Sequence, residues 1–103
     1  MIHDLKCWHE PFEAIFDGRK TYEIRGVRDR DFHVGDRLRL REWVPRVALD
    51  PTDFGFIDKG SYTGRDLTVE VTYISAAGTW GLPDDLCVLA IHLKDASMLI
   101  VDK

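Results

Sequence analysis

Four charged side chains in the first third of the chain have the types and spacing of a ligand-recognition site. Lys20, Glu23, Arg25 and Arg30 closely follow a predicted helix end at Gly18. A lysine ammonium can hold a phosphate as a point charge, whereas arginine offers a planar fork of donors to a phosphate or a guanine edge. A glutamate can accept a hydrogen bond from the exocyclic amine of a base. The cluster therefore predicts a site that recognises a phosphate, a carboxylate or a base.

Further side chains complete the predicted ligand-binding set, namely Lys6, Glu42 and Trp43. Glu42 is a second acceptor for an exocyclic amine, and Lys6 adds a cation. Three aromatic side chains could stack on an unpaired base: Trp8, Tyr22 and Trp43. Strand parity favours exposure of Trp43 over exposure of Trp8. Two alternatives remain, in which the aromatic rings fill the core of a small barrel and the charged side chains form structural ion pairs.

The length and composition indicate one small folded domain that spans residues 1–103. The chain has 103 residues, 45% of them hydrophobic and 31% charged. No apolar run approaches the ~18 residues of a membrane span, and the amino terminus lacks the pattern of a secretory signal. We therefore expect a cytoplasmic protein without a membrane partner. Cys7 and Cys87 lie in apolar, strand-like segments and are expected to be buried free thiols.

Charge is distributed unevenly along the chain. The net charge is -4, yet residues 18–46 contain nine Lys or Arg and only five Asp or Glu. The overall charge argues against indiscriminate binding of polyanions, whereas the local excess of cations marks a segment that could contact phosphate or carboxylate. A solvated basic strand face is the alternative interpretation.

The elements before this segment are a strand and a helix. Ile2–Trp8 alternates apolar and polar residues and predicts a strand. Pro11 suits the first turn of a helix, and Gly18 suits its left-handed cap. The apolar stripe of this helix is expected to consist of Phe12, Ile15 and Phe16. A helix this short is marginal alone, so its stripe must dock on a sheet.

The next strand, Tyr22–Arg25, is expected to carry the charged residues on one face. Tyr22 and Ile24 share one side, and Glu23 and Arg25 share the other, because strand side chains alternate. If the apolar side faces the core, the other presents an acid and a base together.

The clearest alternation in the chain is Arg37–Arg41, in which leucines alternate with arginines. This pattern predicts a strand with one apolar and one cationic face. Continuing the parity places Glu42 on the leucine side and Trp43 on the arginine side. A carboxylate on the buried side needs a partner, or a bulge must turn it away.

The rest of the chain predicts a loop and further strands. Residues 45–64 are rich in Pro and Gly and are expected to form a loop that could act as a mobile flap. Strands are expected over residues 67–73 and 86–93, and a last one over residues 98–101. The predicted fold is α+β, a small mixed β-barrel of five to six strands with one or two short helices.

The sequence resembles the DUF3850 family, a bacterial and phage branch of the ASCH group within the PUA-like superfamily. The residues that carry the resemblance are His3-x-Leu5-Lys6, Phe12, Gly18-x-Lys20, Glu23-x-Arg25, Asp29-Arg30-x-Phe32, Gly35-Asp36, Leu40-x-Glu42-Trp43 and Val88-Leu89. The resemblance implies a PUA-like barrel with a cleft between the first helix, the strand after Gly18-x-Lys20 and a neighbouring loop. It also implies binding of RNA or of a modified nucleotide.

The resemblance implies an enzymatic alternative as well. One ASCH branch hydrolyses acetylated cytidine with a Lys just after the helix and a Thr three residues later. Lys20 matches that Lys, whereas Glu23 stands at the position of the Thr. A small amidohydrolase acting on acylated nucleosides would use Lys20 and Glu23 as its catalytic pair. A third interpretation is a phage or bacterial adaptor that binds a protein through its acidic surface.

The sequence predicts neither a cofactor nor a metal site. His3, Cys7 and His9 are nitrogen and sulfur donors near one another, but no Cys-x-x-Cys or His-x-x-x-His pair completes a zinc set. The serines lie in no nucleophile-elbow context. Recognition of a single-stranded or modified nucleotide is therefore the leading interpretation.

Overall fold

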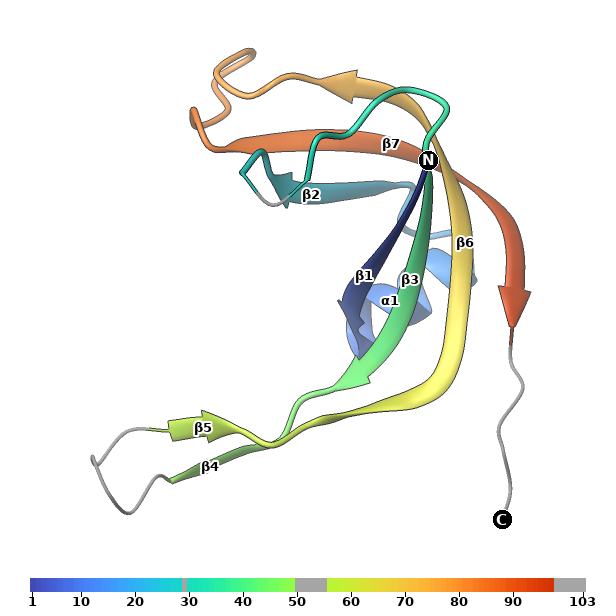
Figure 1. The fold of residues 1–103 in the computed structure, drawn as a ribbon, viewed down its shortest axis with the longest axis vertical. Coiled ribbons are helices and arrows are strands. Elements are labelled where there is room, and N and C mark those ends of the chain that lie inside the picture. The colour runs from blue at the N-terminus through green and yellow to red at the C-terminus, as the bar shows by residue number, and fades with distance from the viewer. Residues whose placement is uncertain (29, 50–55, 98–103) are drawn as a thin grey trace.

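A five-stranded sheet curls around one short helix in the computed structural model, which describes residues 1–28, 30–49 and 56–97. The strand order is β1-β3-β6-β7-β2, with β1 at one edge and β2 at the other. The bounds are β1 Ile2–Trp8, α1 His9–Phe16, β2 Tyr22–Gly26, β3 Arg37–Val44, β6 Ser61–Ser75 and β7 Leu86–Ser97. A separate pair of strands, β4 Val47–Leu49 and β5 Phe56–Asp58, projects from the body (Figure 1).

The curl brings the two edge strands to the same side of the molecule. β1 runs parallel to β3, and the other pairs of neighbouring strands are antiparallel. β6 is 15 residues long, and its pairing with β7 shifts register twice. Such irregularities bend a strand and increase its twist. The resulting half-barrel leaves β1 and β2 facing each other, connected along the chain by α1.

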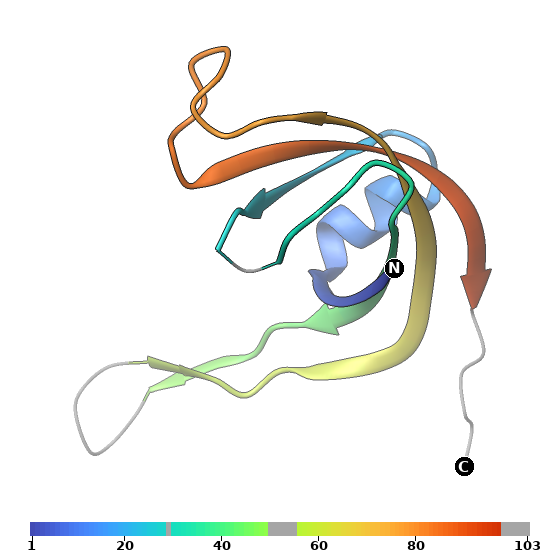
Figure 2. The same ribbon diagram turned by 45° about the horizontal axis from the view of Figure 1, so that its top comes forward.

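The core lies between the concave side of the sheet and α1 (Figure 2). Phe12 is fully buried and Ile15 nearly so, and both lie on the face of α1 that packs on the sheet. The sheet contributes alternate residues, including the fully buried Leu38, Leu40, Leu67, Val69, Val71 and Leu89. The other side chains of β1, β3 and β6 form the outer face of the sheet, on the side away from α1.

Most elements expected from the sequence are present. The strands at Ile2–Trp8 and Arg37–Arg41 are confirmed. The strand predicted over residues 67–73 extends further at both ends, and the one predicted over residues 86–93 extends further at its carboxyl end. Gly18 adopts φ +86° just after the helix, in the left-handed region that glycine tolerates. Both cysteines are buried and free, as expected. The α+β half-barrel agrees with the fold class predicted above.

The condition considered for Tyr22–Arg25, that its apolar side faces the core, is not met. Ile24 is 53% exposed and Tyr22 is also exposed, whereas Glu23 is only 4% exposed. The strand lies at the edge of the sheet, where its inner side meets an open cleft rather than packed apolar side chains. A buried carboxylate is accommodated there because cations neutralise it, as described below.

Three other expectations need correction or fall outside the described chain. Phe16 is 43% exposed and does not belong to the buried stripe of α1. Within residues 45–64, Val47 pairs with Asp58 and Leu49 with Phe56, so part of the predicted loop is a strand pair. Strands of three residues are too short to produce a recognisable alternation. Residues 61–64 of the predicted loop belong to β6. Residues 50–55 of the expected flap and the strand predicted over residues 98–101 lie outside the described residues.

No helix in the described ranges is both long and apolar enough to cross a membrane.

Replacing Phe12 should destabilise the fold far more than replacing Phe16. Phe12→Ala opens a cavity between α1 and the sheet and should lower the free energy of unfolding by about 3–5 kcal/mol. Phe16→Ala, on the same helix but 43% exposed, should cost at most about 1 kcal/mol. Urea unfolding followed by circular dichroism measures both. Equal losses would show that α1 docks through a different face.

Candidate functional site

A cleft opens between the two edge strands of the curled sheet. Its volume is about 470 Å³, within the ~300–1,000 Å³ of typical small-molecule sites. It is lined by Lys6, Cys7 and Trp8 of β1, Pro11 of α1, Lys20 of the following turn, and residues 22–25 of β2. We call it the β1–β2 cleft. Four of the predicted ligand-binding residues line it: Lys6, Lys20, Glu23 and Arg25.

The turn after α1 places Lys20 at this cleft. The amide of Gly18 donates to Ile15 O, and the amide of Lys20 donates to Ala14 O at 2.9 Å. The Arg19 side chain pairs with Asp17 across the same turn. These bonds satisfy carbonyls at the helix end and fix the path of the chain into β2. The ammonium of Lys20 is thereby held beside the inner side of β2.

Glu23 is the buried anion of the cleft, and two cations hold it. Lys20 Nζ donates to Glu23 Oε1 at 2.7 Å. Arg25 donates to Glu23 Oε2 through Nε at 3.0 Å and through Nη2 at 2.9 Å. An ionised carboxylate in this position would be very costly without such partners. With two cations around one anion, the trio keeps a net positive charge facing the cleft.

Internal pairing leaves several N–H donors available in the cleft. Lys20 uses two of its three ammonium hydrogens, on Tyr22 O and Glu23 Oε1. Arg25 directs Nε and Nη2 to Glu23 and to Lys6 O. Its Nη1 has no partner among the described residues. The cleft therefore favours a ligand that brings acceptor oxygens, as a phosphate or a base carbonyl does.

Arg25 also joins the two edges of the sheet. Its Nη2, on β2, donates to Lys6 O on β1 at 2.9 Å. In a closed barrel, backbone hydrogen bonds would join β1 to β2. Here the Arg25 side chain makes a hydrogen bond between these two strands. Arg25 is therefore placed both to hold Glu23 and to set the width of the cleft.

The cleft also has an aromatic rim and a buried thiol. Trp8 is 52% exposed, and Tyr22 lies with its ring centre 4.8 Å from Lys20 Nζ. Both rings are placed to contact a planar ligand group. Burial, assisted by the negative charge of Glu23, raises the pKa of the Cys7 thiol to about 12. Because only the thiolate is a strong nucleophile, Cys7 is not suited to attack a substrate at neutral pH.

Three other predicted ligand-binding residues lie outside the β1–β2 cleft. Arg30 lines a separate hollow near the start of β1 and donates to Asp4 O at 3.1 Å. Trp43 lies on the outer face of the sheet, and Glu42 points to the opposite, buried side. The expected order of exposure was wrong, because Trp8 is exposed whereas Trp43 is only partly so. The turn beside Trp43 brings Gly60 against its indole ring.

Glu42 is buried as strand parity predicted, and its partner is Arg65. Arg65 donates to Glu42 through Nε and Nη2, each at 2.7 Å, and Thr63 Oγ1 donates at 2.6 Å. These hydrogen bonds, Arg65 first among them, lower the pKa of Glu42 to about 2. Pairing with Glu42 and Glu13 in turn raises the pKa of Arg65. The pairing of β3 with β6 also shifts register between Arg41 and Trp43, but Glu42 remains buried, so its partner and not the bulge accommodates the carboxylate.

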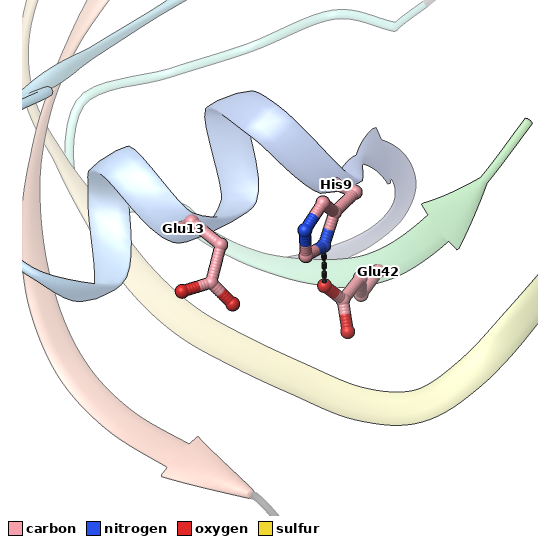
Figure 3. A group of neighbouring side chains, drawn as sticks. All are labelled: His9, Glu13 and Glu42. Carbon is pink, nitrogen blue, oxygen red and sulfur yellow. Dashed lines mark hydrogen bonds and ion pairs between the residues drawn. The ribbon is translucent and has the colours of Figure 1, made fainter.

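Among the described residues, one group of side chains near Glu42 could hold a metal ion. Donor atoms of His9, Glu13 and Glu42 all lie within 4.8 Å of one another (Figure 3). A histidine with two carboxylates can bind a divalent cation. However, the Arg65 guanidinium already bonds both carboxylates, and His9 Nδ1 lies 2.5 Å from Glu42 Oε2. We therefore assign this cluster a structural role, in which it ties α1 to β3 and β6.

Sequence reasoning missed two of these polar contacts. Arg65 was overlooked because its partners lie far away in the chain, on α1 and β3. The second contact joins His3 Nε2 to Asp36 Oδ2 at 2.9 Å, and Asp36 also accepts the amide of His33. The bond to His3 lowers the pKa of Asp36. The one signal in the sequence for the contact with Asp36 was His3, a polar residue at an inward position of the first strand.

Comparison with known proteins assigns the family. The model of the family described as "Domain of unknown function (DUF3850)" matches residues 2–91. The chain belongs to the DUF3850 family. This DUF3850 chain is also similar to a protein of Escherichia phage P2 described as "Uncharacterized 12.9 kDa protein in GpA 3'region". The two are 29% identical over 79 residues, which cover 77% of this chain and 59% of the phage protein.

The ion pair between Glu42 and Arg65 should make this DUF3850 chain sensitive to acid. Because folding lowers the pKa of Glu42 from 4.5 to about 2, its ionised form stabilises the fold above about pH 4.5. That contribution, at most about 3 kcal/mol, is lost as pH falls toward 2. Glu42→Gln should therefore be less stable than wild type at pH 7, and the gap should shrink by pH 3.

Urea unfolding at a series of pH values measures this effect. Glu70→Gln is the matched control, because Glu70 is more exposed and pairs with Lys94 at 3.5 Å. Its gap to wild type should be small at every pH. A gap for Glu42→Gln that stays constant between pH 7 and pH 3 would contradict the buried ion pair.

Proposed function

We propose that this DUF3850 protein binds a nucleotide of single-stranded or modified nucleic acid in the β1–β2 cleft. The observation that carries the proposal is the arrangement of Lys20, Glu23 and Arg25. Glu23 aligns both cations, and N–H donors of both remain available to a ligand. A phosphate or a base carbonyl supplies the matching acceptors, and the exposed rings of Trp8 and Tyr22 offer surfaces for the base.

The predicted affiliation with the PUA-like superfamily and its ASCH group fits this proposal. A curled sheet with one helix between its first two strands, and a cleft beside that helix, agrees with the expected barrel. We propose this affiliation on the architecture and on the motifs identified in the sequence.

Binding is better supported than hydrolysis in the same cleft. Both carboxylate oxygens of Glu23 accept hydrogen bonds from cations, so action as a general base would first require breaking one of them. The raised pKa of Cys7 argues against a thiolate nucleophile. Hydrolysis of an acylated nucleoside by Lys20 and Glu23 and the role of protein adaptor remain predictions from the sequence.

Removing the Lys20 charge should weaken nucleotide binding. Lys20→Met should lower the affinity for nucleoside monophosphates by about tenfold or more, because a charge-assisted hydrogen bond is worth about 1.5–3 kcal/mol. The dependence of binding on salt should also become shallower. Isothermal titration calorimetry at several salt concentrations measures both effects.

Two variants make this experiment decisive. Lys94→Met removes a lysine that also pairs with a glutamate, Glu70, but lies outside the cleft, and it should bind like wild type. Lys20→Met combined with Glu23→Gln avoids a poorly paired buried carboxylate and should still bind weakly. If no nucleotide binds the wild type, or if both lysine variants bind equally well, the proposal is wrong.

A further inference from the structure

Aromatic and cationic side chains meet on the outer face of the sheet, next to the β1–β2 cleft. They are Lys6 and Trp8 of β1, Arg41 and Trp43 of β3, and Tyr62 of β6, and we call them the aromatic platform. Trp8 is the register partner of Trp43, and Trp43 is the register partner of Tyr62. Three rings therefore follow one another across three adjacent strands, which lie about 4.8 Å apart.

Cations and rings alternate within the platform. Lys6 Nζ lies 3.9 Å from the ring centre of Trp43, and Arg41 Cζ lies 3.8 Å from that of Tyr62. The two rings meet edge to face, with centres 4.9 Å apart and planes at 76°. These contacts hold flexible cations close to aromatic surfaces and preorganise the set.

The platform keeps aromatic surface accessible. Trp8 is 52% exposed and Tyr62 is 41% exposed. Trp8 makes no ring or cation contact with the described part of the chain. Adjacent exposed rings on a sheet are a recurrent feature of proteins that stack bases of single-stranded RNA.

On the outer face, Arg39 forms salt bridges, whereas the two cations of the platform form none with the described residues, although Asp66 is the register partner of Arg41. Arg39 pairs with Asp4 at 3.4 Å and with Asp66 at 3.1 Å. In the platform itself, neither Lys6 nor Arg41 pairs with a carboxylate of the described residues. This combination of cations and rings complements a chain of phosphates and bases better than it complements an apolar protein surface.

Continuity with the cleft decides which ligand fits. Lys6 and Trp8 line the β1–β2 cleft and also begin the platform. A nucleotide held by Lys20 and Arg25 therefore has its neighbours in the chain directed over Trp8 toward Tyr62. We propose that the platform binds the nucleotides that flank the one in the cleft, so that the ligand is a single-stranded oligonucleotide. This inference rests on the proposed function of the cleft.

Binding measured against oligonucleotide length tests the inference. Fluorescence anisotropy competition would compare nucleoside monophosphates with short oligo(U) and oligo(dT) of increasing length. Wild type should gain affinity with length. Tyr62→Thr and Arg41→Gln should each lose about fivefold or more of the oligonucleotide affinity, because stacking of one base is worth about 1–3 kcal/mol. Both variants should bind monophosphates like wild type.

Arg37→Gln is the matched control for charge. Arg37 lies on the same strand and the same outer face as Arg41, and both have an acidic register partner on β6, Glu70 and Asp66 respectively. Among the described residues, only Arg41 of the two contacts an aromatic ring. This control should lose much less oligonucleotide affinity than Arg41→Gln. Circular dichroism and thermal unfolding show that each variant is folded before its binding is compared.

The outcomes separate the platform from the cleft. An affinity that does not rise with length, or equal losses for Arg37→Gln and Arg41→Gln, overturns the platform even if monophosphates bind. Oligonucleotide binding that depends on Tyr62 but not on Lys20 supports the platform and overturns the proposed function of the cleft. A preference for oligo(U) or oligo(dT) identifies RNA or DNA as the source of the ligand, and either result supports the inference.

Discussion

The carboxylate of Glu23 is buried at the open side of the curled sheet, and its need for cations organises that side. Removing an ionised carboxylate from water is costly unless cations and hydrogen bonds compensate it. Lys20 and Arg25 provide both, and Arg25 also reaches the backbone of β1. The same contacts that satisfy the acid thus fix the separation of the two edge strands. They also leave donors directed at the space between them.

The sequence predicted elements best where apolar residues alone determine the inward side. Leu38 and Leu40 orient the third strand unambiguously, so the burial of Glu42 and the outward position of Trp43 could both be foreseen. In the second strand, hydrophobic alternation alone would turn Tyr22 and Ile24 inward, whereas both are exposed. The inward residue of this strand is the charged Glu23. Hydrophobic periodicity does not predict the burial of a charged residue whose cost is offset by ion pairs.

The candidate site could be predicted only where its members are close in sequence. Lys20, Glu23 and Arg25 lie within one turn and strand, so their convergence followed from local pattern. The partner of Glu42 is Arg65, which lies on another strand, and the neighbours of Trp43 come from β1 and β6. Such contacts depend on strand order and register, which one sequence does not determine. The aromatic platform therefore becomes visible only in the folded sheet.

Mapping the binding surface by NMR tests the central claim most directly, namely that the β1–β2 cleft is the ligand site. In a ¹⁵N-labelled sample titrated with a nucleoside monophosphate, the largest shift changes should fall on the backbone amides of residues 20–25 and on the indole N–H of Trp8. Amides of the remote strand β7 beyond Leu93 should change little. Changes centred on that part of β7, or none at millimolar nucleotide, would contradict the account.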